Sequence, residues 1–172
     1  MYKKLTPRAA NRLTSGGQIV TVATTSKEGV ADIMTAAWNT PYDSDQVLVV
    51  LDRGHTTTNI IETGKFVVAI PHEGQIADIN RVGSIHGRDS GDKFAWAKIT
   101  PVTSEVLGIK TLPDALAYIE CELVDLETLK KTGVCIGKAV NITVKEELWD
   151  EEHSSFAAGF AKTLHYISED AY

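Results

Sequence analysis

Residues 52–59, with the sequence DRGHTTTN, concentrate hydrogen-bonding side chains between two apolar runs. One guanidinium, three hydroxyls and one carboxamide come from Arg53, Thr56, Thr57, Thr58 and Asn59. A helix is predicted to begin here, and a helix N-terminus offers unpaired N–H groups and a partial positive charge. The segment therefore indicates an anion site suited to a phosphate. The alternative is that Thr57 or Thr58 simply caps the helix.

A second segment, ADIMTAAWNTP (31–41), has small residues where a strand is usually bulky. Thr35, Ala36 and Ala37 precede Trp38. Small side chains would let a flat ligand lie against the backbone and hydrogen-bond to it. A strand packed into a crowded interior, with Trp38 in the core, explains the same residues, and both interpretations stay open.

A third segment, HGRDSGDKF (86–94), brings the positive charge of Lys93 into a polar, glycine-containing loop. Taken by itself, this segment is typical of a solvated loop in which the lysine pairs with a neighbouring aspartate.

Apolar runs rich in Val and Ile predict the strands that position these segments. The first-half strands are expected at 18–26, 30–38, 46–52 and 65–71. Gly29 in the link KEG predicts a hairpin between the first two. Two longer strands, at 115–129 and 133–148, are expected to form a hairpin through KKTG, followed by a short helix or loop at 154–162 and a last strand at 164–168.

Few helices are expected. The segment 57–64 ends at Gly64, a usual C-terminal residue, and 72–85 carries one apolar face. Since hairpins dominate, the chain is predicted to be mainly β, a largely antiparallel closed barrel. Its 172 residues are expected to form a single domain, 1–172.

Composition excludes several classes of protein. The net charge of −6 argues against nucleic-acid binding, and no apolar stretch is long enough to cross a membrane. The N-terminus lacks a signal-peptide pattern, and Cys121 and Cys135 are predicted to be small core residues, so a cytoplasmic location is expected. The histidines are scattered, which predicts no metal site, and the acidic run 146–153 is predicted to be solvated.

Four segments in order and spacing carry a family resemblance: VTVATTSKEGVADIMTAAWNTP, DRGHTTTNIIETGKFVVAIP, HGRDSGDKFAWA and ALAYIECEL. They resemble the flavin-reductase-like family of FMN-binding split barrels, to which flavoredoxins belong. The resemblance implies an antiparallel split β-barrel that forms a homodimer and holds FMN non-covalently near the subunit interface.

The resemblance also implies the contacts. The segment matching MTAAW would lie along the flavin ring and ribityl chain through Thr35, Ala36, Ala37 and Trp38. The segment matching RGHTTTN would bind the phosphate through Arg53, Thr56, Thr57, Thr58 and Asn59, and Lys93 would also approach the phosphate. It implies no catalytic side chain.

The implied activity is that of an FMN-dependent oxidoreductase of the flavin reductase type, passing electrons from NAD(P)H through FMN to an acceptor such as a redox partner protein. One departure from the family's sequence pattern bears on the electron donor. Many NAD(P)H-dependent members have Gly-Asp-His where this chain has Lys131, Thr132 and Gly133. The alternatives are therefore a flavoredoxin-like electron carrier or a non-enzymatic flavin-binding sensor.

Overall fold

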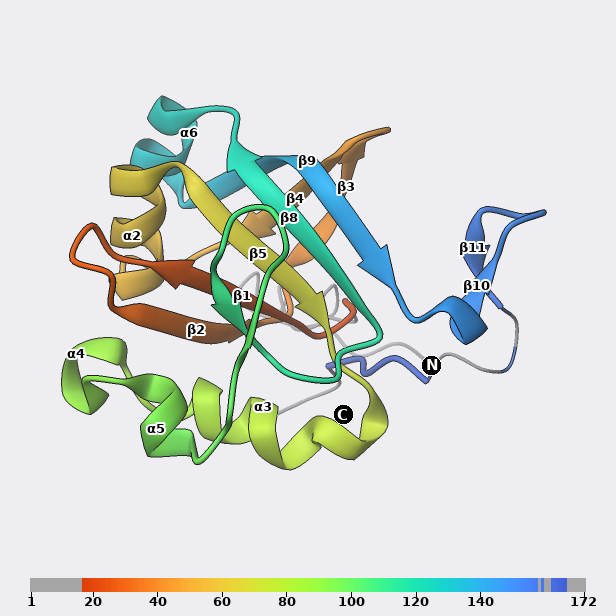
Figure 1. Ribbon diagram of the computed structural model, residues 1–172. Coiled ribbons are helices and arrows are strands. Elements are labelled where there is room, and N and C mark those ends of the chain that lie inside the picture. The colour runs from red at the N-terminus through yellow and green to blue at the C-terminus, as the bar shows by residue number, and fades with distance from the viewer. Residues whose placement is uncertain (1–16, 158, 160–161, 167–172) are drawn as a thin grey trace, which may run out of the picture.

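A seven-stranded antiparallel sheet dominates the computed structural model, which describes residues 17–157, 159 and 162–166 (Figure 1). The strand order is β2-β1-β5-β8-β9-β4-β3. The strands are β1 (Val20–Thr25), β2 (Ala31–Ala36), β3 (Asn39–Asp43), β4 (Gln46–Val50), β5 (Lys65–Ile70), β8 (Ala117–Leu123) and β9 (Val134–Val144). The predicted hairpin between the first two strands is present, with Gly29 at φ 85° in its turn.

The sheet curls into a half-barrel because its two end strands, β2 and β3, are neighbours in the chain. Only Ala37 and Trp38 separate them, and the Trp38 carbonyl already accepts a hydrogen bond from the Val50 amide at 2.8 Å. The predicted mainly β, antiparallel split barrel is confirmed. The prediction of a closed barrel is wrong, because the outer edge of β2 faces helices, and no strand of the described residues pairs with it.

Both faces of the sheet are covered by apolar side chains, since alternate residues of a strand point to opposite faces. On β5, Val67 and Ala69 belong to one cluster and Phe66 and Val68 to the other. The first cluster packs against helices α3 (Ile76–Gly83) and α5 (Lys93–Ala97), and the second against α2 (His55–Thr63) and α6 (Leu126–Thr132).

The two cysteines belong to the second cluster, where both are free and buried. Burial raises the pKa of Cys121 and of Cys135 to about 12, so both stay protonated thiols at neutral pH. The prediction that they are small core residues is confirmed.

Local end signals predicted two helices well. Helix α2 ends where Gly64 adopts φ 70°, as predicted, and begins two residues earlier than expected. The segment 72–85 forms a 3-10 helix, η2 (Glu73–Gln75), followed by α3. Of the apolar face predicted from Ile76, Ile79 and Val82, the last two are buried and Ile76 is exposed.

Three predictions for elements were wrong. The two long strands pair antiparallel as expected, but the KKTG link belongs to helix α6, because Asp125 caps its start through the Thr128 amide at 2.9 Å and Gly133 ends it at φ 80°. The expected loop 86–94 contains helix α4 (Gly87–Ser90) and the start of α5. Strand β3 was missed because NTPYD is polar and contains a proline, which strands tolerate only at an edge.

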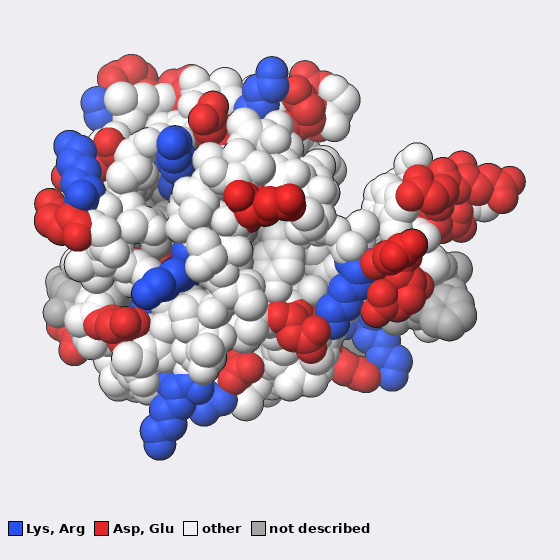
Figure 2. Space-filling model, viewed as in Figure 1, with Lys and Arg blue, Asp and Glu red and all other residues white. Residues whose placement is uncertain are grey.

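The C-terminal region forms a small projecting arm. Here η3 (Glu146–Leu148) leads into the paired strands β10 (Trp149–Asp150) and β11 (Ser155–Phe156). Figure 2 shows acidic side chains gathered on this arm, and Glu146, Glu147, Glu151 and Glu152 are exposed, as predicted for 146–153. Of the expected strand 164–168, His165 bridges Gln18, while 167–168 lie outside the described residues, as does part of 154–162.

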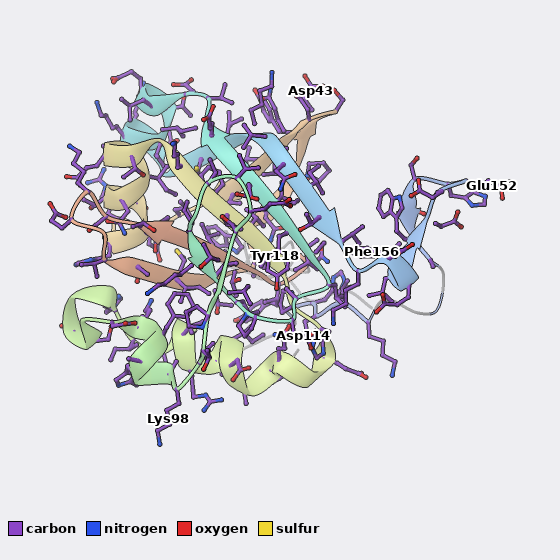
Figure 3. All side chains as sticks on the ribbon, in the orientation of Figure 1. Asp43, Lys98, Asp114, Tyr118, Glu152 and Phe156 are labelled. Atoms are coloured by element: carbon purple, nitrogen blue, oxygen red, sulfur yellow. The ribbon has the colours of Figure 1, made fainter. Side chains whose placement is uncertain are left out.

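A long segment between α5 and β8 crosses the sheet and carries the two-residue strands β6 (Val102–Thr103) and β7 (Lys110–Thr111). Its end is held by Tyr118, whose hydroxyl donates to the Leu112 carbonyl at 2.9 Å and accepts from the Ala115 amide at 3.0 Å (Figure 3). Asp114, at the surface nearby, pairs with Lys145 at 2.6 Å. These contacts fix the segment against the first core cluster.

Glu120 holds the middle of the same segment. Its carboxylate is buried and accepts hydrogen bonds from the amides of Glu105, Val106 and Leu107 at 2.6–3.1 Å and from Asn141 Nδ2 at 2.8 Å. Burial by itself would raise the pKa of Glu120, but the hydrogen bonds from Asn141, Leu107 and Val106 outweigh it and lower the pKa below its ordinary 4.5.

We expect Glu120→Gln to lower the free energy of unfolding at pH 7 by about 2 kcal/mol, because an amide NH₂ would face backbone N–H donors. Since the folded-state pKa is lowered, the stabilisation by the carboxylate is complete above 4.5 and is lost as the pH falls through the lowered value. Urea unfolding at pH 7 and about pH 3 checks this. The exposed neighbour Glu122→Gln is the control, and an unchanged wild-type–variant difference at the lower pH would contradict the assignment.

Candidate functional site

A cavity of about 320 Å³ lies at the outer edge of β2, between the start of α2 and the link from α3 to α4. We call it the edge cavity; Asp32, Thr35, Arg53, Thr56, Gly87 and Lys93 are among its lining residues. A second cavity of about 490 Å³, the helix cavity, adjoins it along α2 and includes Ser26, Thr58, Asn59 and Gly91. Asp32, His55 and Gly87 line both, so the two form one continuous site of the size that small ligands occupy.

The edge of β2 supplies backbone groups to this site. Among the described residues, strand β2 pairs with β1 alone, so the N–H and C=O groups of every second residue point away from the sheet. The Ile33 carbonyl is one of these, because it accepts a hydrogen bond from Lys93 Nζ at 2.6 Å. The main chain of Thr35, two residues further on, therefore also faces outward and can bind the polar edge of a flat ligand.

The structure divides the small-residue strip that was expected to contact a flat ligand. Thr35 lines the edge cavity, with its hydroxyl donating to the Ile79 carbonyl at 2.7 Å. Ala36 is buried in the second core cluster, and Ala37 packs against the first. Trp38 is 50% exposed and outside the cavity lining, so the alternative that placed it in the core is wrong.

The start of α2 has free donors. Its N-cap is Gly54, with no side-chain cap, so the alternative in which Thr57 or Thr58 caps the helix is wrong. Each threonine hydroxyl donates to a protein acceptor: Thr56 to Asp32 Oδ2 at 2.6 Å, Thr57 to the Asp52 carbonyl at 2.5 Å, and Thr58 to the Gly54 carbonyl at 3.1 Å. The first-turn amides and the exposed Arg53 guanidinium therefore remain as the anion donors of the edge cavity.

The expected phosphate ligands do not all meet at one point. Arg53, Thr56 and Lys93 line the edge cavity, whereas Thr58 and Asn59 line the helix cavity and Thr57 lines neither. Asn59 is buried, and its Nδ2 donates to Thr24 Oγ1 at 2.9 Å. This hydrogen bond and that of Thr56 tie α2 to β1 and β2, so these two side chains position the helix.

Lys93 is buried, although it was expected in a solvated loop. Asp92 caps α5 through the amides of Phe94 and Ala95, which fixes the backbone of Lys93. Its ammonium lies 3.6 Å from Asp32 Oδ1, so the expected pairing with a neighbouring aspartate is wrong. Burial lowers the pKa of Lys93, and the Asp32 carboxylate opposes that shift.

Asp32 lines the candidate site and was not predicted from the sequence. Its side chain is buried, and its Oδ1 atom has no hydrogen-bond partner among the described residues. A Cβ on Gly87 would lie 2.8 Å from Oδ1, so a side chain at this position would press against that buried oxygen. A carboxylate inside the apolar run VADIM was the available signal, because buried charges are rare without a partner.

Two further properties concern only the described part of the chain. There, no group of three or more His, Cys, Asp or Glu side chains is arranged to hold a metal ion. Within the same residues, no helix is both long and apolar enough to cross a bilayer.

Solved structures share this fold. An FMN-binding protein from Thermus thermophilus with bound 1-cyclohex-2-enone has a TM-score of 0.81 at 23% identity, covering 100% of this chain and 93% of its own. The FMN-binding domain of a flavin reductases-like enzyme from Shewanella baltica has 0.80 at 23%, covering 95% and 88%. The flavoredoxin of Desulfovibrio vulgaris (Miyazaki F) has 0.77 at 22%, covering 96% and 93%. At these identities the likeness establishes the split-barrel fold.

The family assignment rests on the sequence match. The model of the flavin reductase like domain matches residues 13–167, which include all seven strands of the main sheet and every residue of the edge cavity. Together with the shared fold, this match shows that the chain belongs to the flavin reductase-like family.

Proposed function

We propose that the edge cavity binds FMN and that the protein is an FMN-dependent oxidoreductase of the flavin reductase type. The observation that carries the proposal is the meeting, in one cavity, of the open backbone edge of β2 with the uncapped start of α2 and Arg53. One end offers donors to a phosphate, and the other offers main-chain groups to a flat ring. Family membership supports the same ligand.

The residues present fit this cofactor. Arg53 and the first-turn amides of α2 would hold the phosphate, and the main chain of β2 at Thr35 would hold the ring. Thr56 and Asn59 would hold α2 in place through their hydrogen bonds to β2 and β1. When bound, FMN supplies the acceptance and release of electrons, while the protein binds it and shields it.

NAD(P)H is the electron donor that we propose for the reductase. Lys131 and Thr132 end helix α6, and neither they nor Gly133 lines the edge cavity. A nicotinamide would therefore have to meet the flavin itself, without a nucleotide-binding motif of its own. The alternative is a flavoredoxin-like carrier that exchanges electrons with a redox partner protein, or a non-enzymatic flavin sensor.

Absorbance spectra of the purified protein test this proposal. We expect a yellow protein, or one that turns yellow with FMN, absorbing near about 450 nm as oxidised flavins do. Anaerobic bleaching by NADH or NADPH would support the reductase. Colour that persists with both nucleotides but bleaches with dithionite would favour the carrier or sensor, and a protein that takes up no FMN would contradict flavin binding.

We also propose a homodimer. The exposed large apolar side chains include Trp38 (50%), Tyr42 (57%), Val140 (41%) and Ile142 (62%). These four lie on β3, its leading link and the end of β9, which pairs with β4 only as far as Lys138. Covering such side chains favours association. Light scattering should give twice the 18.7 kDa chain mass, and Ile142→Asp should shift it towards the monomer.

Two further predictions are retained. The single domain, 1–172, is supported by a family match that spans most of the chain. A cytoplasmic location is supported by two buried cysteines that remain free thiols, as a reducing compartment allows. Fractionation of the native cells checks the location.

A further inference from the structure

The edge cavity contains two buried charges of opposite sign that leave hydrogen-bonding capacity unused. Lys93 Nζ has three protons and gives one to the Ile33 carbonyl at 2.6 Å. Asp32 accepts from Thr56 through Oδ2 at 2.6 Å, but its Oδ1 has no partner among the described residues. The ammonium and Oδ1 are 3.6 Å apart, too far for a hydrogen bond. An open donor and an open acceptor therefore lie side by side.

We infer that Asp32 and Lys93 bind a hydroxyl group of the ligand, which in FMN is a hydroxyl of the ribityl chain, and that Lys93 does not bind the phosphate. This inference rests on the proposed function. A hydroxyl both accepts and donates, so its oxygen can accept from Lys93 while its proton goes to Asp32 Oδ1. An ionised phosphate only accepts and would leave Oδ1 unpaired.

The charges of Asp32, Lys93 and Arg53 support the same assignment. Asp32 neutralises Lys93, so the pair has little net attraction for an anion, and its carboxylate would repel a phosphate placed against it. Arg53 has no such neutralising contact among the described ion pairs, and it lies beside the free amides at the start of α2. The phosphate therefore belongs to Arg53 and α2, and the hydroxylated chain to Asp32 and Lys93.

Burial makes this pair selective. Both side chains are at most 6% exposed, so a ligand that fills the cavity without a hydroxyl leaves Asp32 Oδ1 and the remaining Lys93 protons without a hydrogen bond. Leaving buried polar groups unpaired is how sites reject analogues that lack a hydroxyl. Gly87 contributes because any side chain at this position would press against Oδ1.

Ligand titrations of the wild-type protein test the inference through quenching of flavin fluorescence. Lumiflavin has the ring without the hydroxylated chain, and riboflavin has that chain without the phosphate. We expect riboflavin to bind at least about tenfold more tightly than lumiflavin. Added salt should reduce the preference for FMN over riboflavin, because that preference depends on the exposed Arg53. It should leave the preference for riboflavin over lumiflavin unchanged. Equal binding of lumiflavin and riboflavin would overturn this inference but leave the proposed function standing.

Lys93→Met separates the two roles of the lysine. We expect FMN and riboflavin affinities to fall by the same factor, about tenfold, with lumiflavin unchanged. A loss confined to FMN would make Lys93 a phosphate ligand and overturn the inference. Lys65→Met, on the exposed start of β5, is the matched control.

If Lys93→Met does not fold, the double variant Asp32→Asn/Lys93→Met removes both charges and retains an acceptor for Thr56. The same equal loss of FMN and riboflavin affinity is expected from it, and a loss confined to FMN would overturn the inference. Failure of all three flavins to bind would instead overturn the proposed function, and the inference with it.

Discussion

Replacing Arg53 with glutamate should weaken FMN binding about 100-fold and leave riboflavin binding within about threefold of wild type. Arg53 is the exposed cation of the edge cavity, beside the uncapped start of α2. The change removes a charge-assisted hydrogen bond and places a carboxylate beside the phosphate. Riboflavin carries no phosphate, so only contacts to the ring and chain govern its affinity. Fluorescence titration with both flavins measures the difference.

Lys110→Glu is the matched control, because Lys110 is an exposed residue of β7 that lines neither cavity. It alters the net charge by the same amount and should leave both affinities unchanged. Equal losses of FMN and riboflavin in the Arg53 variant would show that the phosphate lies elsewhere.

Adding one methyl group at Gly137 should cost about 3 kcal/mol of unfolding free energy, although alanine usually stabilises a strand relative to glycine. A Cβ at Gly137 would lie 2.2 Å from Phe66 Cζ and 2.9 Å from Cys121 Cβ. Phe66 is fully buried in the second core cluster, so its ring has little room to move away. Urea unfolding of Gly137→Ala measures the loss.

Phe66→Leu should rescue that variant, because leucine lacks the distal ring carbon that the new methyl would meet. In the leucine background we expect Gly137→Ala to cost less than about 1 kcal/mol, an interaction that a double-mutant cycle reports directly. If the free-energy costs of Gly137→Ala and Phe66→Leu simply add, the clash with the ring is not the cause of the lost stability.

The position of the site follows from the curl of the sheet. Because β2 ends the strand order, no strand in the described part of the chain pairs with its outer backbone groups, and an unpaired edge must be covered. Lys93 covers one carbonyl, and the helices α2, α3 and α5 surround the rest. The cavity therefore lies where a sheet of this order cannot close through its own hydrogen bonds.

Local signals in the sequence were sufficient for several elements. Gly64 and Gly29 fix positive-φ positions that end α2 and turn the first hairpin, and both were predicted because such conformations depend on a few neighbouring residues. The prediction for 126–133 was wrong although it also used local signals. Apolar residues suited a strand, but the Asp125 cap and Gly133 favour helix α6. A cap contact can be recognised from spacing, and it was overlooked there.

By itself, the sequence determined the mainly β class, the family resemblance and the polar segment at 52–59, since each depends on residue type and order along the chain. Only the tertiary structure decided which side chains share the cavity. Asp32 contacts Lys93 and Thr56 across large separations in the sequence, and the Thr56 hydroxyl donates to its carboxylate. Strand pairing and burial fix these meetings, and neither leaves a short-range pattern in the chain.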